Sequence, residues 1–234
     1  MKKIVVKILS AVVVMAVCIG CGGGGDRMRI TVEGSGEISF SLSGSGMATV
    51  DWGDGSDRTT LELNERGTRF SKVYASSGRH TITITGNDMI GLGMHSERLI
   101  SLDVRRNPKL KWLNVSGKQL TSLDLRNNAA LTSLTILGTQ LTNLDLSRNT
   151  ALTGLGVRQG QLTNLDLSRN TALTWIDIQF SQLTTSALNA LFESLPPASG
   201  ENNRINIGYN PGTNDANRSI AEAKGWRVTA HQGW

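Results

Sequence analysis

The sequence predicts a mostly β protein with C-terminal helices, in which a small β-sandwich is followed by a solenoid of repeated coils. Three observations predict this fold class. Residues 99–182 hold four copies of a 21-residue leucine pattern, residues 29–86 alternate apolar and polar side chains, and residues 188–195 space apolar side chains as one helical face. A fixed period of this length is typical of stacked coils, each of which buries its apolar side against the next.

The chain begins with a pattern typical of a secretory signal peptide over residues 1–20. Three lysines precede an apolar run, residues 8–19, that is too short to span a bilayer comfortably. The segment VCIGC resembles a bacterial lipobox in which Cys18 replaces the usual leucine. This resemblance implies cleavage after Gly20 and lipidation of Cys21, and a cleaved leader without a lipid is the alternative.

Removal of the leader changes what composition implies. The net charge falls from +5 to about +2, and no basic run with interleaved aromatic residues remains, so we expect no nucleic-acid partner. With Cys18 discarded and Cys21 lipidated, the exported part has no disulfides. Residues 21–28 form the lipid anchor and a glycine-rich tether. No aspartate follows Cys21, which favours the outer membrane over the inner membrane. We also expect the anchored protein to be a monomer displayed at the cell surface.

Residues 29–87 predict the β-sandwich, because turn residues separate short alternating runs. The alternating apolar positions are Ile30, Val32, Ile38, Phe40, Leu42, Ala48, Val50, Leu61, Leu63, Ile82 and Ile84. The segments ATVDWGDGSD and VYASSGRHTITITG resemble the polycystic-kidney-disease (PKD) type of immunoglobulin-like domain. The matching residues are Trp52, Gly53, Asp54, Gly55, Tyr74, Gly78, Ile82 and Ile84. The resemblance implies a spacer or a module that contacts protein or carbohydrate.

Three carboxylates lie close together in this domain, at Asp51, Asp54 and Asp57. Calcium prefers several carboxylates on one loop, but the spacing differs from that of an EF-hand. Asp54 followed by Gly55 is also a strong hairpin-turn pair. We therefore expect a structural turn, with calcium binding as the alternative.

Each 21-residue copy consists of an eleven-residue phrase and a ten-residue phrase. In the third copy these begin with Leu141, Leu144 and Leu146, and with Leu152, Leu155 and Val157. Positions two apart alternate as in a strand, and the leucine three residues earlier lies at a bend. Stacked copies would line these side chains into one continuous core.

The four copies resemble the bacterial leucine-rich repeat family, over residues 88–183. The nested form is similar to an irregular subclass with a strand on both sides of each coil, as in lipoproteins of gut Bacteroidetes. The resemblance implies that buried asparagines satisfy backbone groups in the bends; we call them the asparagine ladder, which is Asn107, Asn128, Asn149 and Asn170. In the ten-residue phrase a column of glutamines is expected to form a substitute amide ladder: Gln119, Gln140, Gln161 and Gln182.

A column of aspartates in the eleven-residue phrases forms what we call the acid ladder, at Asp103, Asp124, Asp145 and Asp166. Successive strands would place them about 4.8 Å apart. We expect Arg106, Arg148 and Arg169 to screen them, and a structural role. A catalytic pair needs two different environments, whereas these positions repeat. The three histidines lie in separate segments without ligand spacing. The sequence therefore predicts no enzyme, cofactor or metal.

Residues 184–234 predict an αβ cap. Leu188, Leu191, Phe192 and Leu195 form a helical face that starts near Thr184 and stops at two prolines. Ile205 and Ile207 then resemble a repeat strand. A second helix is expected over residues 215–224, with Gly225 as its left-handed stop and Trp226 and Val228 in a final strand.

The copies differ at the outward positions of the ten-residue strands, while the eleven-residue phrase is nearly constant. Aromatic residues and arginine there are typical of interfaces, and aromatic rings also stack on sugars. The glycines at 154 and 156 leave room for a partner, or for Trp175 to lie flat. The candidate ligand-binding residues are Trp112, Asn114, Leu137, Arg158, Trp175, Asp177 and Gln179.

These observations predict a cell-envelope lipoprotein that binds a protein or a glycan, from a host or a bacterial surface, through the repeat face. The alternative is a periplasmic or surface accessory module. In it the PKD-like domain makes the contact and the solenoid is a spacer.

Overall fold

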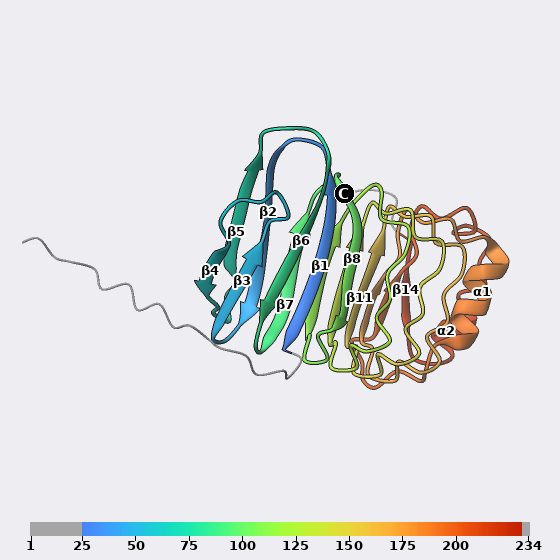
Figure 1. Ribbon diagram of the computed structural model, residues 1–234. Helices are drawn as coiled ribbons and strands as arrows, with labels where there is room; N and C mark the ends of the chain where they lie inside the picture. Colours follow the sequence, from blue (N-terminus) through green and yellow to red (C-terminus); the bar gives the residue numbers. More distant parts are fainter. Residues whose placement is uncertain (1–24, 231–234) are drawn as a thin grey trace, which may run out of the picture.

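The computed structural model describes residues 25–230, which form a mostly β structure with two short helices at one end (Figure 1). This confirms the expected predominance of strands. The expected signal peptide, the lipidation site Cys21 and the last four residues lie outside the described part. Within it, neither helix is long and apolar enough to cross a membrane.

The strands form two sheets. The five-stranded sheet has the order β4 (Thr59–Glu62), β3 (Met47–Asp51), β6 (Arg79–Gly86), β1 (Asp26–Glu33) and β8 (Leu99–Arg106). The nine-stranded sheet has the order β14 (Arg227–Thr229), β13 (Arg204–Asn206), β12 (Trp175–Asp177), β11 (Gly154–Arg158), β10 (Ser133–Leu137), β9 (Trp112–Ser116), β7 (Met89–His95), β2 (Gly36–Gly44) and β5 (Thr68–Tyr74). Both sheets cross the expected boundary at residue 87, and the division into separate domains stays a prediction.

The 21-residue period appears directly in the pairing of the parallel strands. Leu113 in β9 lies opposite Leu134 in β10, which lies opposite Leu155 in β11. All three are buried, together with the leucines of the bends. On the opposite side of the coils, Leu144 and Leu165 are buried as well, and Leu123 packs against the same core. The leucine pattern therefore predicts both the stacking and the core.

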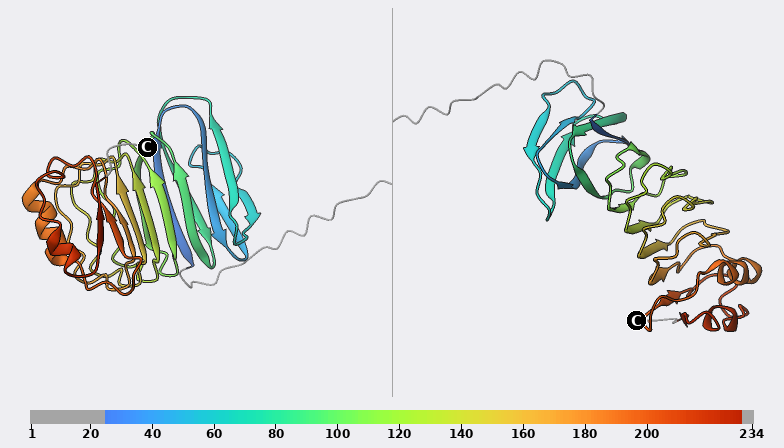
Figure 2. Two further views of the ribbon diagram at one scale, coloured as in Figure 1. Left: turned by 180° about the vertical axis from the view of Figure 1, so that it is seen from behind. Right: turned by 90° about the horizontal axis from the view of Figure 1, so that it is seen from below.

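The first coils are covered by the N-terminal antiparallel strands. β7 belongs to the parallel stack, because Leu92 pairs with Leu113, 21 residues later. On its other edge β7 pairs with β2, while β8 pairs with β1. Figure 2 shows the two N-terminal layers passing into the stack of coils without a break. The backbone groups at that end of the stack are thus paired rather than left as an open edge.

The eleven-residue side differs from the expected second row of strands. Only its first copy forms a strand, β8, which pairs with β1. Within the described residues, the later copies have no strand at the corresponding positions, and a turn begins two residues after each aspartate. All four acid-ladder side chains accept a hydrogen bond from the backbone N–H two residues later. The four donors are the amides of Arg105, Arg126, Ser147 and Ser168, at 2.8–3.1 Å. The bond is present in β8 as well, so the pairing with β1 is what distinguishes the first copy.

Three of the four asparagines of the ladder bind backbone groups as expected, in the interior of the stack; the Asn107 amide is buried there without a hydrogen-bond partner among the described residues. Asn149 Nδ2 donates to the carbonyl oxygens of Leu125 (3.1 Å) and Asn128 (2.9 Å), both in the preceding coil. Asn128 and Asn170 repeat this arrangement, and all the ladder side chains are fully buried. The glutamines of the ten-residue phrase are instead exposed. The expected glutamine ladder was wrong, because those side chains extend into solvent.

Two helices cover the last coil on its eleven-residue side (Figures 1 and 2). α1 (Thr185–Ser194) begins after Thr184, whose hydroxyl accepts from the Ala187 amide (3.3 Å). The Leu167 amide in turn donates to Ser194 Oγ (3.1 Å). The second helix is shorter than expected, with α2 at Ser219–Glu222; Gly225 is left-handed, at φ 83°. The cap therefore gives an amide of the last coil a hydrogen-bond acceptor.

We expect Asn149→Ala to destabilise the protein by about 2–3 kcal/mol, because it removes two hydrogen bonds between coils and leaves a small cavity; each of the two carbonyls keeps one bond from a backbone amide, Asn128 or Leu131. Urea unfolding followed by circular dichroism measures this. Gln161→Ala, which changes an exposed amide of the neighbouring phrase, should change the free energy of unfolding by less than about 0.5 kcal/mol. Equal effects of the two changes would show that the ladder is not a main source of stability.

Candidate binding face

The outward side chains of β9, β10, β11 and β12 form one surface, which we call the strand face. Alternation along each strand buries its second and fourth residues and turns the first, third and fifth outward. The 21-residue register then places equivalent positions side by side, so Trp112, Ser133, Gly154 and Trp175 form one row. Six of the seven predicted ligand-binding residues lie at these outward positions, and the seventh, Gln179, is the second residue after β12.

Each tryptophan of the strand face lies over a pair of glycines in the preceding strand. A Cβ added to Gly154 would lie 3.6 Å from the Trp175 ring, and one added to Gly156 would lie 3.4 Å from it. The Trp112 ring covers Gly91 and Gly93 in the same way. A Cβ at Gly91 would lie only 2.0 Å from Trp112 Cε2, so that position accepts no side chain while the ring keeps its place.

The glycine pairs explain how two large apolar rings are held on an outward surface. One side of each indole packs on backbone, and both tryptophans remain only half-buried. A ring fixed in this way loses little conformational freedom when a ligand covers its other side. Of the two alternatives for the space over the glycines at 154 and 156, the structure therefore shows the second: the Trp175 ring itself occupies that space rather than leaving it for a partner.

Asp177 is the most buried charged side chain of the strand face, with 7% of its surface exposed. Burial raises its pKa above the usual carboxyl value, against the opposing effects of the Gln179 amide and of Arg158. The Arg158 guanidinium lies 3.7 Å away, at the outward edge of β11. Trp175, Arg158 and Asp177 thus form one cluster of aromatic, cationic and anionic groups.

The remaining predicted residues lie farther along the same surface. Gln179 directly follows the cluster, whereas Trp112 and Asn114 lie three strands away on β9, about 14 Å at the spacing of parallel strands. Asn114 Oδ1 is buried and has no hydrogen-bond partner among the described residues. Leu137 is half-buried on β10, between the two groups. The strand face therefore offers two aromatic positions separated by a shallow polar strip.

A groove that the sequence did not predict continues the strand face beyond Trp175. It has a volume of about 330 Å³, and Arg204 and Arg227 supply its cationic side chains. These arginines occupy the first positions of β13 and β14, in register with Trp175. The sequence did contain a signal for Arg204, because residues 205–207 resemble a repeat strand. Aligning that strand with the earlier copies and extending it by one residue toward the N-terminus places Arg204 in the row of Trp112 and Trp175.

A second missed feature is the stacked pair of Phe180 and Tyr209. Their ring centroids lie 4.1 Å apart with an interplanar angle of 9°, and each is about 40% exposed. Both residues have positive φ, 55° and 58°, a conformation that costs a bulky side chain about 1 kcal/mol or more. The equivalent turns of earlier coils hold Gly138 and Gln159. Phe180 occupies the position of Gly138 and Gln159 in the next copy, and an aromatic residue at this position was the feature of the sequence that could have indicated the pair.

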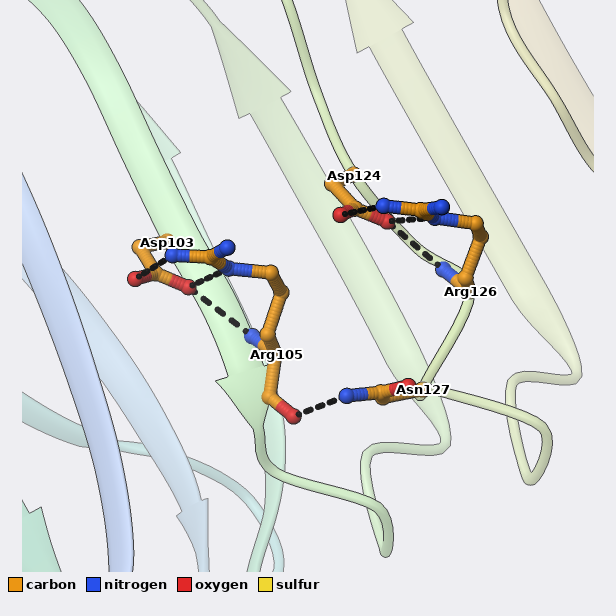
Figure 3. Close-up of polar contacts among 5 residues, drawn as sticks. All are labelled: Asp103, Arg105, Asp124, Arg126 and Asn127. Atoms are coloured by element: carbon orange, nitrogen blue, oxygen red, sulfur yellow. Dashed lines mark hydrogen bonds and ion pairs between the residues drawn. The ribbon is translucent and has the colours of Figure 1, made fainter.

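The acid ladder forms different pairs from those expected (Figure 3). Asp103 and Asp124 each bind the guanidinium two residues later, on Arg105 and Arg126, through two hydrogen bonds of 2.9–3.0 Å. In the next two coils Ser147 and Ser168 occupy those positions. Arg106, Arg148 and Arg169 form no ion pair within 4 Å among residues 25–230, because the turn after each aspartate brings the second residue, not the third, beside the carboxylate. The charges of Arg148 and Arg169 still lower the pKa of Asp145 and Asp166, so part of the expected screening is present.

These contacts lower the pKa of every acid-ladder carboxyl. Hydrogen bonds from Arg126 lower the pKa of Asp124 to about 2, and those from Arg105 or from serines lower the others. All four are therefore ionised at neutral pH. A general acid needs a raised pKa, and none of these groups has one.

The histidines and the aspartates of the Asp51–Asp57 turn, which are the other candidates for catalysis or metal binding, lie apart from one another. His80 stacks on Tyr74 and His95 contacts Ser116, whereas His231 lies outside the described residues. At the turn, Asp51 pairs with Arg58 (3.2 Å), and Asp54 accepts from Ser56 and pairs with Lys72 (3.2 Å). Within residues 25–230, no three histidine, cysteine or acidic side chains gather as a metal site would require.

Two of the solved structures that are similar to this chain come from Listeria monocytogenes. The functional domain of InlJ, described as including a cysteine ladder, is 29% identical, with a TM-score of 0.42; the match covers 51% of this chain and 25% of that one. An internalin, InlF, is 16% identical with a TM-score of 0.33, over 56% of this chain and 50% of that one. This chain thus spans between a quarter and half of their lengths.

No protein-family model matches the chain, and no curated protein matches it. With TM-scores this low, the binding face has to be argued from the geometry of this chain alone.

We expect Gly91→Ala to displace the Trp112 ring and to destabilise the protein by about 1–3 kcal/mol, because the new methyl group would occupy the space of the indole. Gly154→Ala is the matched control, since its methyl group would make an ordinary contact with Trp175. Urea unfolding and near-ultraviolet circular dichroism measure both effects. A silent Gly91→Ala would mean that the indole does not hold this position.

Asp177 predicts a dependence of stability on pH. Because burial raises its pKa in the folded state, unfolding releases a proton above the ordinary value near 3.8. Stability from this group is therefore present at low pH and lost as pH rises through the folded pKa. We expect Asp177→Asn to remove that loss in thermal unfolding between pH 4 and 7, as its oxygen still accepts from Gln179. The pKa of Asp145 is lowered, so its contribution is lost only as pH falls below the ordinary value of 3.8, and Asp145→Asn should leave the profile between pH 4 and 7 nearly unchanged.

Proposed function

We propose that this chain is a non-catalytic binding protein that recognises a protein or glycan of a host or bacterial surface through its strand face. The observation that carries the proposal is the seating of Trp112 and Trp175 on glycine pairs, which turns one side of each ring outward. Buried or part-buried aromatic residues and arginine dominate binding energy at interfaces, and flat rings also stack on sugars.

The contrast between the two sides of the coils supports this proposal. The eleven-residue side repeats an Asx turn in every copy, with donors from the same chain. The strand face instead carries a different set of side chains on each strand. Stacking needs only the inward leucines and the ladder bonds, so the outward variation is free to fit a ligand.

We further propose that the protein is a monomeric lipoprotein, anchored through Cys21 to the outer membrane and displayed at the cell surface. The lipobox-like segment VCIGC, the absence of an aspartate after Cys21 and the glycine-rich tether support this placement. Residues 29–87 would then be a PKD-like module at the start of a leucine-rich repeat solenoid, with an αβ cap over residues 184–234.

The alternative function places the contact on the PKD-like module and makes the coils a spacer. Exposed apolar side chains on the N-terminal strands support this alternative. Val73 on β5 is 67% exposed, and Met47 on β3 is 52% exposed, so the N-terminal strands also present apolar side chains to solvent.

We expect the double change Trp112→Ala and Trp175→Ala to abolish binding of the chain starting at residue 22 to its targets on arrays of host glycoproteins, host glycans and bacterial polysaccharides. Replacement of both tryptophans by phenylalanine should retain part of the binding, because a flat ring remains. Asn143→Ala with Asn164→Ala is the control, since both side chains are exposed on the opposite side of the coils. Thermal unfolding of each variant checks that it folds.

Unchanged binding after loss of both tryptophans would contradict the strand-face proposal. If Val73→Ser abolished binding while the tryptophan variants retained it, the contact would instead lie on the N-terminal module.

A further inference from the structure

Four arginines surround a groove on the side of the molecule opposite the strand face. The groove has a volume of about 290 Å³, and its lining residues are Arg27, Arg29, Asp103, Arg105, Arg106 and Asn127. Arg27 and Arg29 come from the beginning of β1, and Arg105 and Arg106 from the end of β8. Because β1 and β8 are antiparallel neighbours, the beginning of β1 lies beside the end of β8, and all four arginines lie at that end of the two strands.

The groove holds more positive charge than its own contacts neutralise. Asp103 binds the Arg105 guanidinium in a bidentate pair (Figure 3), and no other carboxylate lines the groove. Arg27 lies directly opposite Arg106 in the strand register, where like charges destabilise a sheet. Arg27 Nε is buried and finds no hydrogen-bond partner among the described residues. An anion with several oxygens would satisfy this donor and relieve the repulsion.

The chemistry of the groove favours a phosphate group. Guanidinium groups present a planar fork of donors that matches phosphate oxygens in pairs. The neighbouring groove along the coils, lined by Arg105, Arg126 and Arg148 around Asp124, continues the positive surface. Asn127 lines both grooves, and its Nδ2 donates to the Arg105 carbonyl (3.1 Å) (Figure 3).

The length of the tether indicates where that phosphate would come from. Six Cα–Cα steps separate Cys21 from Arg27, which span at most about 22 Å even when fully extended. An acyl chain on Cys21 would therefore hold the arginine groove close to the lipid headgroups.

We propose that this groove binds the headgroup phosphate of an anionic membrane lipid and thereby orients the anchored protein on its membrane. The inference rests on the proposed lipid anchor at Cys21. Docking by this edge leaves the strand face uncovered, because its tryptophans lie on the other sheet. The groove thus fixes the direction in which the binding surface points.

Vesicle binding of the chain starting at residue 22, which keeps every described residue, tests the groove without the acyl anchor. The probes are phosphatidylglycerol vesicles, phosphatidylcholine vesicles and inorganic phosphate, with sedimentation for the vesicles and calorimetry for phosphate. We expect binding to phosphatidylglycerol, and about 30-fold weaker binding after Arg27→Gln with Arg106→Gln, at about 1 kcal/mol per charge. Arg29→Gln with Arg106→Gln leaves the part-buried Arg27 in place and should weaken binding similarly.

The matched control is Arg79→Gln with Lys118→Gln. It removes the same amount of positive charge from the opposite end of the strands. Arg79 pairs with Glu33 at the far end of β1, about 20 Å from Arg27 and beyond the screening length of physiological salt. This control should bind phosphatidylglycerol as the unchanged chain does.

Three results would overturn the inference: equal loss in the control, equal binding to phosphatidylcholine, or binding of inorganic phosphate as tight as that of vesicles. Fatty-acid labelling of the full chain, compared with Cys21→Ser, tests the anchor separately. Labelling lost in Cys21→Ser together with groove-dependent binding supports the inference, and an unlabelled full chain removes the tether argument. The array experiment on the strand face is independent of both.

Discussion

The structure depends on one constraint: a 21-residue coil can bury its leucines and give its bend carbonyls a second hydrogen bond only against the next coil. Asn128, Asn149 and Asn170 each donate to two carbonyls of the preceding coil, and each inward leucine packs on its equivalents. Neither contact exists in an isolated coil. The two ends of the stack therefore need different solutions, and antiparallel strands cover the first coils while a helix and a serine hydroxyl complete the last.

The same constraint makes the two sides of the coils different. On the eleven-residue side, the aspartates close local turns, so their charge is already committed to neighbouring amides, arginines and serines. On the strand face, the backbone is paired by the neighbouring strands and the side chains are free to vary. The glycine pairs use that freedom, because only a bare backbone lets an indole lie against the preceding strand. A large aromatic ring on an outward position thereby becomes an ordered surface.

Much of the fold and part of the candidate site followed from sequence. The leucine period gave the stack, the asparagine column gave the buried ladder, and alternation placed Trp112 and Trp175 outward. The partners of the acid ladder did not follow, because a linear offset does not say how the chain turns after each aspartate. Arg204, Arg227 and Tyr209 were also missed, since the segments that carry them leave the 21-residue period and join the strand face only through pairing with β12.

The sequence by itself determined which side chains point inward, because the periods of leucine and asparagine are properties of the chain that every coil must obey. Only the tertiary structure decided which charges meet and where they accumulate. Arg27 and Arg106 are 79 residues apart and become neighbours because β1 lies between β6 and β8. Electrostatic energy depends on distance in space, and a pairing between distant strands leaves no local pattern from which that distance can be read.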